Sequence, residues 1–347
     1  MIYDKLKIKK NVVLFFRKRN ENFFSIENVF NTLFPDLSKL NNIEIFELPF
    51  FNSNILNLLK NIIFAKKHSG CINHITGDVH YIALGLSKSN TILTIHDIES
   101  LLKGNPVKRF IHKLFWIKIP IRHVKYVTVI SNATKTKLLE QVTVNPEKII
   151  VIPNCVFPKF TFSSYIFNNS CPTILQVGVT QNKNLESLSY ALVGINCKLV
   201  ILGNLNPSQI VLLNKLHIVY ENYSNLSQND VVELYRKCDL VTLISFYEGF
   251  GLPIIEAQAT GRPVITSNIS SMPEVAGNGA LLVNPYDISE IRNAITDIIN
   301  KPYLREELIK NGLENIKRFR PEEIAKKYSE LYVKVYEESI KKQSVDK

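Results

Sequence analysis

Two glutamates, with seven residues between them, stand in the segment SFYEGFGLPIIEAQATGRPVITS (residues 245–267). Glu248 precedes a turn with two glycines, and Glu256 lies about one turn inside a helix expected to begin near Leu252. Carboxylates accept hydrogen bonds from hydroxyls, glycines let a ligand approach the backbone closely, and a helix N-terminus attracts phosphate through its free N–H groups. The spacing therefore favours a ligand with hydroxyls on both sides of a diphosphate, as in a nucleotide sugar. The alternative is a pair of solvated acids at the start of a helix.

Short β-rich runs alternate with helical stretches along the whole chain, which is typical of parallel sheets covered by helices on both faces. The runs lie at 11–16, 43–48, 71–76, 91–96, 126–130 and 148–152 in the first half, and at 173–178, 197–203, 217–220, 240–245, 263–267 and 280–284 in the second. Helices are expected at 53–68, 78–87, 106–119 and 132–141, and near the end of the chain at 303–318 and 321–343. Two such halves predict an α/β fold with two Rossmann-like, doubly wound parallel-sheet domains.

The boundary between the halves is expected in residues 157–172, which are rich in aromatic, Ser, Asn and Pro residues and lack helical periodicity. This places a first domain at 1–165, a second at 166–322 and a terminal helix at 323–347. In open parallel sheets a ligand binds beyond the carboxyl ends of the strands. The segment with the two glutamates begins at such a place, after the run at 240–245.

Length and composition limit the alternatives. At about 150 residues for each domain, 347 residues make roughly two domains. The five cysteines have wide, irregular spacings without a CxxC pair, which indicates neither a zinc site nor a redox motif and fits a reducing, cytoplasmic compartment. The charged N-terminus does not read as a secretory signal, and no apolar run approaches the roughly 20 residues of a membrane-spanning helix.

The net charge of +11 arises in the first half of the chain. Residues 1–165 carry 23 Lys and Arg against 11 Asp and Glu, whereas residues 166–347 carry 19 against 20. An anionic membrane surface, an anionic substrate or nucleic acid would each account for this excess, and so would solubility alone. The segment 103–125 mixes seven basic with three aromatic residues, which suits a membrane interface and equally a core helix with its lysines in water. No nucleic-acid-binding signature accompanies it, so nucleic acid is the weakest of these partners.

Six segments together resemble one known family, the retaining glycosyltransferases of family 4. The similarity rests on EGFGLPIIEAQATGRPVITSNISSMPEVAG, TILQVGVTQNKNLESL, LYRKCDLVTLIS and GNGALLVNPYD in the second half, and on TILTIHDIES and VTVISNATKTKLLEQ in the first. It covers most of residues 70–320. The resemblance implies a GT-B fold, in which two Rossmann-like domains face a cleft, the first binds the acceptor, the second binds the nucleotide-sugar donor, and the last helix crosses back to the first domain.

The resemblance further implies transfer of a hexose-type sugar from a nucleotide sugar to a glycan, in the assembly of a bacterial surface polysaccharide (lipopolysaccharide or capsule), without a metal or cofactor. Together with the basic first half, this favours a glycan or a lipid-linked oligosaccharide as the acceptor, and a cytoplasmic protein with peripheral attachment to the inner face of the plasma membrane. Two other functions stay open: another GT-B enzyme, such as a nucleotide-sugar epimerase or a glycan phosphorylase, and a non-catalytic nucleotide-sugar-binding partner. A dehydrogenase is disfavoured because no GxGxxG follows the first strand of either half.

The family comparison assigns roles to residues of the second half. Glu248 would contact hydroxyls of the donor sugar, Glu256 those of the ribose, and Lys183 would neutralise the leaving phosphate. The other donor-binding residues would be Gly178 and Asn184 and, through backbone N–H groups at the diphosphate, Phe250, Gly251 and Leu252. Negative charge grows on the leaving nucleoside diphosphate in the transition state, and a positioned cation with N–H dipoles stabilises it without a metal.

One departure from the family pattern concerns the loop that holds Lys183. Many members carry an arginine there, whereas residues 179–182 of this chain supply no second cation. Three explanations stay open: Lys183 acts alone, Asn182 and backbone N–H groups assist it, or Arg262 or another residue reaches in.

His96 ends a strand run in the first half. In the family a histidine on this side lies near the reacting sugar, so His96 is a catalytic candidate. The alternative is a packed loop histidine beside Asp97 as a helix cap.

Four residues of the first half are acceptor-side candidates because they lie in or next to the ends of strand runs. His74 and Asp78 belong to the stretch HITGDVH, whose spacing matches no standard zinc pattern, and no metal site is predicted. Arg17 and Asn22 belong to the loop RKRNENFFS, which lacks the Gly-Gly that the family often has here.

Overall fold

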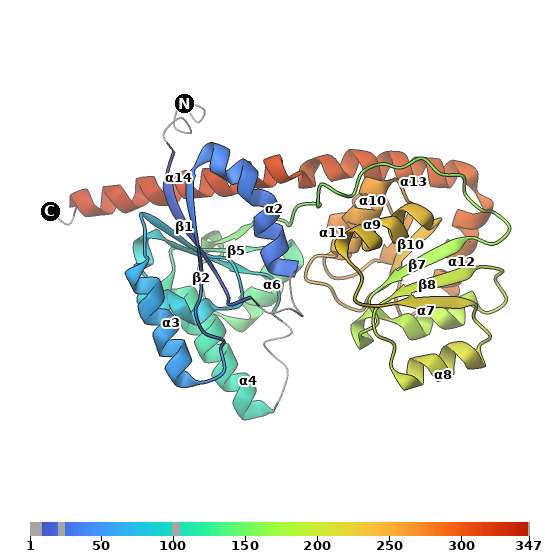
Figure 1. Ribbon diagram of the computed structural model, residues 1–347, viewed down its shortest axis with the longest axis horizontal. Helices are drawn as coiled ribbons and strands as arrows, with labels where there is room; N and C mark the ends of the chain where they lie inside the picture. The colour runs from blue at the N-terminus through green and yellow to red at the C-terminus, as the bar shows by residue number, and fades with distance from the viewer. Residues whose placement is uncertain (1–8, 20–24, 99–104, 346–347) are drawn as a thin grey trace. The chain divides into compact units, whose positions relative to one another are not determined.

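The computed structural model describes residues 9–19, 25–98 and 105–345 (Figure 1). The chain divides into two compact units between residues 155 and 156 and again between residues 320 and 321. The first division falls earlier than the expected boundary at 165, because the intervening residues pack onto the second unit. The Val156 N–H bonds to the Phe319 carbonyl at 2.9 Å, and the Phe160 ring meets the Tyr235 ring edge-on at 5.1 Å.

The first unit is built on six parallel strands in the order β2-β1-β3-β4-β5-β6 (Figure 1). The strands are β1 (Asn11–Phe16), β2 (Asn42–Glu47), β3 (Ile72–Ile75), β4 (Thr91–Ile95), β5 (Tyr126–Val129) and β6 (Ile149–Val151). The helical segments are α2 (Ser25–Leu40), α3 (Ile55–Lys67), η1 (His80–Gly85), η2 (Lys88–Asn90), α4 (Pro106–His112), η4 (Lys113–Lys118), α5 (Ile119–His123), α6 (Asn132–Gln141) and η5 (Pro146–Lys148). The last helix, α14 (Pro321–Val345), also belongs to this unit and packs against α2.

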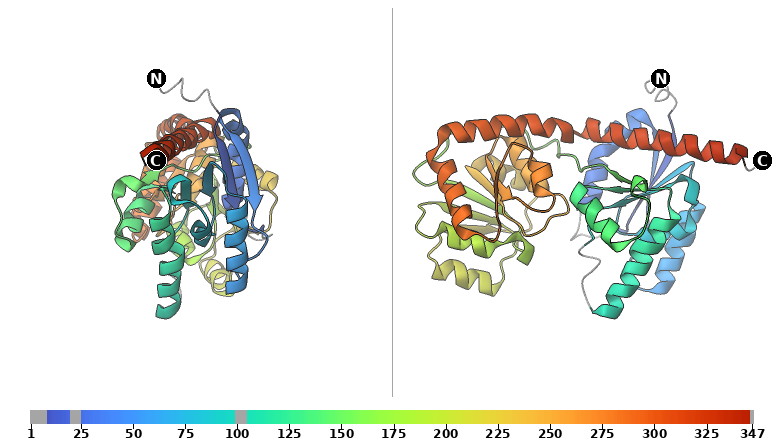
Figure 2. Two further views of the ribbon diagram at one scale, coloured as in Figure 1. Left: turned by 90° about the vertical axis from the view of Figure 1, so that its left-hand side faces the viewer. Right: turned by 180° about the vertical axis from the view of Figure 1, so that it is seen from behind.

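The second unit has its own six-stranded parallel sheet, in the order β12-β11-β10-β7-β8-β9 (Figures 1 and 2). The strands are β7 (Thr173–Val177), β8 (Lys198–Leu202), β9 (Tyr220–Tyr223), β10 (Leu240–Leu243), β11 (Val264–Ser267) and β12 (Leu281–Val283). The helical segments are η6 (Gln181–Lys183), α7 (Leu185–Leu192), α8 (Pro207–Lys215), α9 (Gln228–Lys237), α10 (Leu252–Thr260), α11 (Met272–Ala276), α12 (Ile288–Asn300), α13 (Pro302–Asn315) and η7 (Ile316–Phe319).

These two sheets confirm the predicted α/β fold, and a strand lies in or beside each predicted run. The central strands β3, β4, β5, β10 and β11 are buried along their whole length, which explains why their sequences are nearly continuous apolar runs.

Three elements differ from the prediction. Strand β9 begins at Tyr220 and not at 217, because His217 adopts a left-handed φ of 52° and its N–H closes a turn onto the Asn214 carbonyl after α8. The stretch expected to be a helix at 78–87 contains the 3₁₀ helix η1 in its centre. The helix that begins at Pro106 continues through the π-helical η4 to the end of α5.

The second sheet has a point where the direction of its connections reverses. After β7 the chain moves outward to β8 and β9, and after β10 it moves to β11 and β12 on the other side. The loops that leave β7 and β10 therefore diverge, and they leave room for a ligand beyond the carboxyl ends of these two neighbouring strands. Lys183 lies in the first of these loops and Glu248 in the second.

Candidate active site

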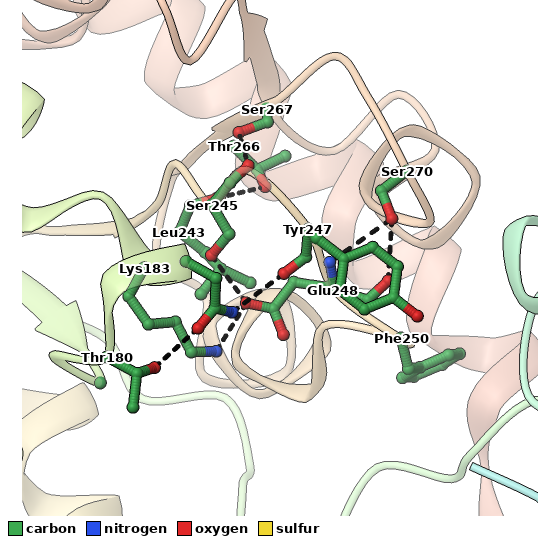
Figure 3. A network of polar contacts seen from close by, with 12 residues as sticks. Thr180, Lys183, Leu243, Ser245, Tyr247, Glu248, Phe250, Thr266, Ser267 and Ser270 are labelled. Atoms are coloured by element: carbon green, nitrogen blue, oxygen red, sulfur yellow. Dashed lines mark hydrogen bonds and ion pairs between the residues drawn. The ribbon is translucent and has the colours of Figure 1, made fainter. Parts of the chain in front are cut away.

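Lys183 and Glu248 meet at the reversal point between β7 and β10 (Figure 3). The Lys183 Nζ lies 2.6 Å from Glu248 Oε1, and the Ser245 hydroxyl donates to the same oxygen at 2.6 Å. The two charged side chains are 18% and 13% exposed, so they are shielded from bulk water and still within reach of a ligand. Partial shielding strengthens their attraction relative to that of a surface pair.

The position of Lys183 is set by the end of strand β7. Gly178 adopts a φ of 87°, and a Cβ at this position would lie 2.9 Å from Lys183 Cε. The Lys183 side chain can take its position because residue 178 is a glycine. The buried Gln176 donates from Nε2 to the Lys183 carbonyl at 3.0 Å and accepts from the Thr242 hydroxyl at 2.9 Å. The sheet interior thus holds the backbone of the lysine.

The loop of Glu248 is held from two sides (Figure 3). The hydroxyls of Ser270 and Ser271 each donate to the Glu248 carbonyl at 2.9 Å. From the other side, Asn182 Nδ2 donates to the Tyr247 carbonyl at 3.0 Å. Asn182 therefore uses its amide to tie the two loops together, which does not fit the explanation that it assists Lys183 at a phosphate.

Helix α10 begins directly after this loop. Gly251 occupies the N-cap with a φ of 105°, and among the residues that the structure describes no side chain caps the helix. The preceding Phe250 is buried and meets the Phe319 ring edge-on at 5.6 Å, which fixes the entry into the helix. In the first turn Pro253 has no N–H, and the Ile254 N–H bonds to the Gly251 carbonyl at 3.0 Å. The Leu252 N–H is therefore the helix group left for an anion.

Glu256 lies inside α10 and is buried. The Tyr235 hydroxyl on α9 donates to Glu256 Oε2 at 2.7 Å. Burial raises the pKa of the Glu256 carboxyl to about 7, against the opposing effects of the Tyr235 hydrogen bond and the positive charge of Lys183. Sequence reasoning did not find Tyr235, because nothing in the α9 sequence marks one tyrosine as the partner of a distant carboxylate.

Asn184 has a structural role at this site. It adopts a left-handed φ of 55° between η6 and α7, is buried, and donates from Nδ2 to the Pro285 carbonyl at 2.7 Å. Asparagine tolerates this conformation better than most residues. Its amide therefore holds the turn after Lys183, and a contact of Asn184 with the donor stays a prediction.

Arg262 does not replace the missing second cation. Its guanidinium is buried, and Nη1 donates to the carbonyls of Ser163 (2.8 Å) and Thr260 (2.9 Å). The same group stacks on the Tyr165 ring at 3.8 Å and donates from Nη2 to the Arg236 carbonyl. These bonds hold the segment that enters the second unit, so the explanation that Arg262 reaches the phosphate is wrong.

His96 follows β4 at the carboxyl edge of the first sheet. Its Nε2 lies 2.8 Å from the Thr76 carbonyl, which only accepts, so Nε2 carries the proton and Nδ1 is an acceptor. Burial lowers the pKa of His96 to about 4, so the ring is neutral at pH 7. A neutral ring with an acceptor nitrogen is suited to a sugar hydroxyl.

Two acceptor-side candidates lie at the same edge of the first sheet. Arg17 pairs with Glu27 of α2, with Nε 2.5 Å from Oε1. Burial raises the pKa of Asp78, and its Oδ1 is buried without a hydrogen-bond partner among the described residues. Asn22 lies outside the described residues.

His74 lies in the core of the first unit. It is fully buried, with Nδ1 2.8 Å from the Tyr332 hydroxyl and Nε2 2.7 Å from the Thr94 hydroxyl. Burial lowers its pKa to about 3. This placement does not fit a contact with an acceptor; His74 instead joins the sheet to α14.

Two searches of the described residues bear on the nature of the site. Within this part of the chain, no three His, Cys, Asp or Glu side chains lie together as they would around a metal ion. None of the described helices is both long enough and apolar enough to cross a bilayer.

Comparison with known proteins places the chain in a family. Residues 160–315 match the model of the glycosyl transferases group 1. The O-antigen chain mannosyltransferase RfbU of Salmonella typhimurium is 30% identical over 254 residues, which cover 70% of this chain and 67% of that protein. The chain belongs to the group 1 glycosyltransferases. Several mannosyltransferases of Escherichia coli also match this group 1 enzyme, each over less than a third of its own length.

Solved structures share the fold of this group 1 glycosyltransferase. The sucrose-phosphate synthase of Thermosynechococcus elongatus aligns with a TM-score of 0.75 and 16% identity, over 94% of this chain and 99% of the other. HepE of Anabaena, in complex with UDP and glucose, aligns with a TM-score of 0.71 and 16% identity, over 93% and 99%. The predicted GT-B fold and the predicted enzyme class are confirmed.

Proposed function

We propose that this enzyme transfers a hexose-type sugar, with mannose as the first candidate, from a nucleotide sugar to a hydroxyl of a bacterial surface glycan, and that it retains the anomeric configuration as family 4 does. The observation that carries the proposal is the Lys183–Glu248 pair beyond β7 and β10, next in sequence to the uncapped start of α10. The names of the relatives refer to mannose and to O-antigen, which supports a mannosyl donor and a lipopolysaccharide-type acceptor.

Donor binding would exchange the partner of Lys183. In the structure the ammonium group is held by Glu248. A diphosphate competes for that ammonium and also receives the Leu252 N–H at the start of α10. Glu248 is then released to accept a hydrogen bond from a hydroxyl of the donor sugar. Glu256 accepts a hydrogen bond from a hydroxyl of the ribose. Each charged group has a partner before and after binding, which avoids an unpaired buried charge.

The chemical step would break the bond between the anomeric carbon and the phosphate oxygen and form a bond to the acceptor oxygen. Negative charge grows on the leaving phosphate, where Lys183 and the N–H dipoles of α10 stabilise it, so no metal is required. The leaving phosphate oxygen takes the acceptor proton on the same face of the sugar, which gives retention. From the family resemblance and their place at the carboxyl edge of the first sheet, His96 would contact the donor sugar and Arg17 and Asp78 the acceptor.

The acceptor would be a lipid-linked oligosaccharide. The enzyme would then work in the cytoplasm, with peripheral attachment to the inner face of the plasma membrane. The basic first half of the chain supports this location, because an inner leaflet rich in anionic lipids attracts positive charge.

The test is thermal stabilisation of the purified protein by UDP, GDP, ADP, CDP and dTDP and by their sugars, with and without EDTA. A ligand at about 100 times its Kd adds roughly 2.7 kcal/mol, which gives a clear shift in Tm. We expect one base to stand out, no effect of EDTA, and loss of the shift in Lys183→Met but not in the exposed control Lys215→Met. Absence of any shift would overturn the donor assignment. Turnover of the stabilising donor without an acceptor would point to an epimerase.

A further inference from the structure

The outward face of α3 is apolar where a surface helix is normally polar. Leu56, Leu59 and Ile63 recur at the spacing of one helix face, and together with Ile55 they are between 51% and 74% exposed. The opposite face supplies the buried Ala65 to the core. Exposed apolar residues are ordinary when they are scattered, but a row of them along one helix marks an interaction site.

A second helical segment adds to this surface. Phe110 and Ile111 on α4 and Phe115 on η4 are also exposed. Both α3 and η4 pack against η1, and they follow crossovers that run in the same direction across the sheet, so they cover the same face of it. In all three views α3 and α4 project from the same end of the first unit (Figures 1 and 2). We call the exposed apolar residues of α3, α4 and η4 the α3–α4 face.

The part of the chain that contains α3, α4 and η4 is strongly positive. Residues 48–139 carry thirteen Lys and Arg and only three Asp and Glu, which is nearly the whole net charge of the chain. Lys60, Lys66 and Lys67 are exposed on α3 itself, and in the described part of the chain no carboxylate pairs with them. These three lysines therefore flank the aliphatic row of α3 with positive charge.

We propose that the α3–α4 face lies on an anionic lipid bilayer, with the aliphatic side chains of α3 among the acyl chains and the lysines at the headgroups. This combination of an apolar row with flanking basic residues is what an interfacial helix needs. Sequence reasoning drew attention to 103–125 alone; the structure adds α3, whose lysines and exposed aliphatic residues make it the main contact.

Other occupants fit this face less well. A second copy of the chain would bring two strongly positive surfaces together, which like-charge repulsion opposes. Nucleic acid would match the lysines and leave the exposed Leu59 and Ile63 in water, because aliphatic side chains neither pair with phosphates nor stack on bases. A bilayer satisfies the charge and the apolar row together.

The experiment is flotation of the full-length protein with vesicles of phosphatidylcholine alone and with about 30 mol % phosphatidylglycerol. The apolar variant is Leu56→Ser/Leu59→Ser/Ile63→Ser, and the charge variant is Lys60→Glu/Lys66→Glu/Lys67→Glu. The matched control is Val211→Ser/Val219→Ser, which removes two exposed apolar residues from the second unit. All of these side chains are exposed, so the variants are expected to fold, and thermal stabilisation by the donor nucleotide verifies it.

We expect the wild type and the control to float with the anionic vesicles and not with the neutral ones. Each triple variant loses about tenfold or more in partitioning, and added salt weakens the wild type. Equal partitioning of the apolar variant and the wild type would overturn the proposal. The proposal would also be overturned if the wild type bound neither kind of vesicle, or if it formed a dimer that the apolar variant abolishes. The result is independent of the transfer reaction, because nucleotide binding is measured separately on the same variants.

Discussion

At the scale of single residues, Glu248 is a carboxylate that pairs with the ammonium group of Lys183. Its Oε1 accepts from Lys183 and from Ser245, both at 2.6 Å. Lys183 cannot serve a diphosphate without giving up part of this pairing. Glu248 therefore competes with the nucleotide for Lys183, and it also contributes the sugar contact on which transfer depends.

This dual role predicts a split between binding and catalysis in Glu248→Gln. Without the competing charge, we expect the nucleoside diphosphate to bind at least as tightly as to the wild type, whereas sugar transfer falls by about 100-fold or more. Calorimetry with the nucleotide and initial rates with the full donor measure the two effects. Glu221→Gln is the control, since Glu221 forms an exposed pair with Lys198 in the same unit. Weaker nucleotide binding together with unchanged transfer would contradict the assigned role.

Tyr235 is a positioning residue that acts through Glu256. Its hydroxyl bond and the charge of Lys183 favour the ionised carboxyl, while burial disfavours it and raises the pKa of Glu256 to about 7. Removing the hydroxyl in Tyr235→Phe raises that pKa further. At about pH 7 a smaller fraction of Glu256 then accepts a bond from the ribose, and we expect the donor KM to rise several-fold.

The dependence on pH separates this role from a purely structural one. At about pH 9 the carboxyl is ionised in both proteins, so the donor KM of Tyr235→Phe should approach that of the wild type. Tyr223→Phe makes the same chemical change at a half-buried tyrosine that bonds to Glu221, and it should leave the KM unchanged across the range. A KM defect that persists at high pH would assign Tyr235 to packing alone.

At the scale of elements, the start of α10 depends on the backbone of Gly251. Its φ of 105° is unfavourable for any residue with a side chain, and a Cβ there would lie 3.1 Å from Ile254 Cδ1. Gly194 has a comparable φ of 76°, and there a Cβ would find only Arg292 Nη2, at 4.0 Å. At both positions an alanine would therefore have a strained backbone, and the two positions differ in their surroundings.

We expect Gly251→Ala and Gly194→Ala each to lower the free energy of unfolding by about 1–2 kcal/mol through that strain. Only Gly251→Ala should also weaken nucleotide binding, because it displaces the Leu252 N–H at the start of α10. Denaturant unfolding and nucleotide titration of both variants provide the measurement. Normal nucleotide affinity in Gly251→Ala would remove the helix start from the proposed diphosphate site.

The strands and the centre of the candidate site could be predicted from the sequence, because both depend on local sequence patterns. Buried parallel strands leave continuous apolar runs, and Glu248 and Glu256 stand on one strand–loop–helix unit whose glycines and spacing are visible in the chain. The loop of Lys183 was placed for the same reason, since it directly follows a strand run. A prediction of this kind needs no knowledge of distant partners.

The roles of several side chains could not be predicted, because their partners lie far away in the sequence. Arg262 bonds to the Ser163 carbonyl, and His74 bonds to Tyr332 on the last helix. In the sequence, an arginine that is buried against carbonyls looks the same as an arginine that binds phosphate. Only the packing of distant segments decides between these roles, and the link between Tyr235 and Glu256 was missed for the same reason.

At the scale of the whole molecule, the first unit is completed by the last helix of the chain. The polar contacts that join α14 to it include Asn41 Nδ2 to the Ser329 hydroxyl (3.2 Å), the Tyr126 hydroxyl to Glu338 Oε1 (2.9 Å), and His74 Nδ1 to the Tyr332 hydroxyl (2.8 Å). Their partners are separated by most of the chain, so this unit can form fully only after the second unit has been synthesised.

The buried histidines make the first unit sensitive to acid. The pKa of His74 is about 3 in the folded protein, against 6.5 for an exposed histidine. Between these values the unfolded chain binds a proton at His74 that the folded chain does not, so the free energy of unfolding falls as the pH decreases through this window. Above pH 6.5 the stabilising contribution of His74 is present in full. His96, with a pKa of about 4, adds a contribution of the same sign. Each histidine adds a slope of roughly 1.4 kcal/mol per pH unit.

Trp116 allows this effect to be measured on the first unit alone, because it is the single tryptophan of the chain and lies on η4. We expect denaturant unfolding followed by its fluorescence to show stability falling between about pH 6.5 and pH 4. His74→Gln should reduce the slope by roughly 1.4 kcal/mol per pH unit, whatever its effect at high pH. Tyr332→Phe is the matched control: it removes the hydrogen bond, lowers stability at every pH, and keeps the slope because His74 still titrates. An unchanged slope in His74→Gln would show that other groups cause the acid sensitivity.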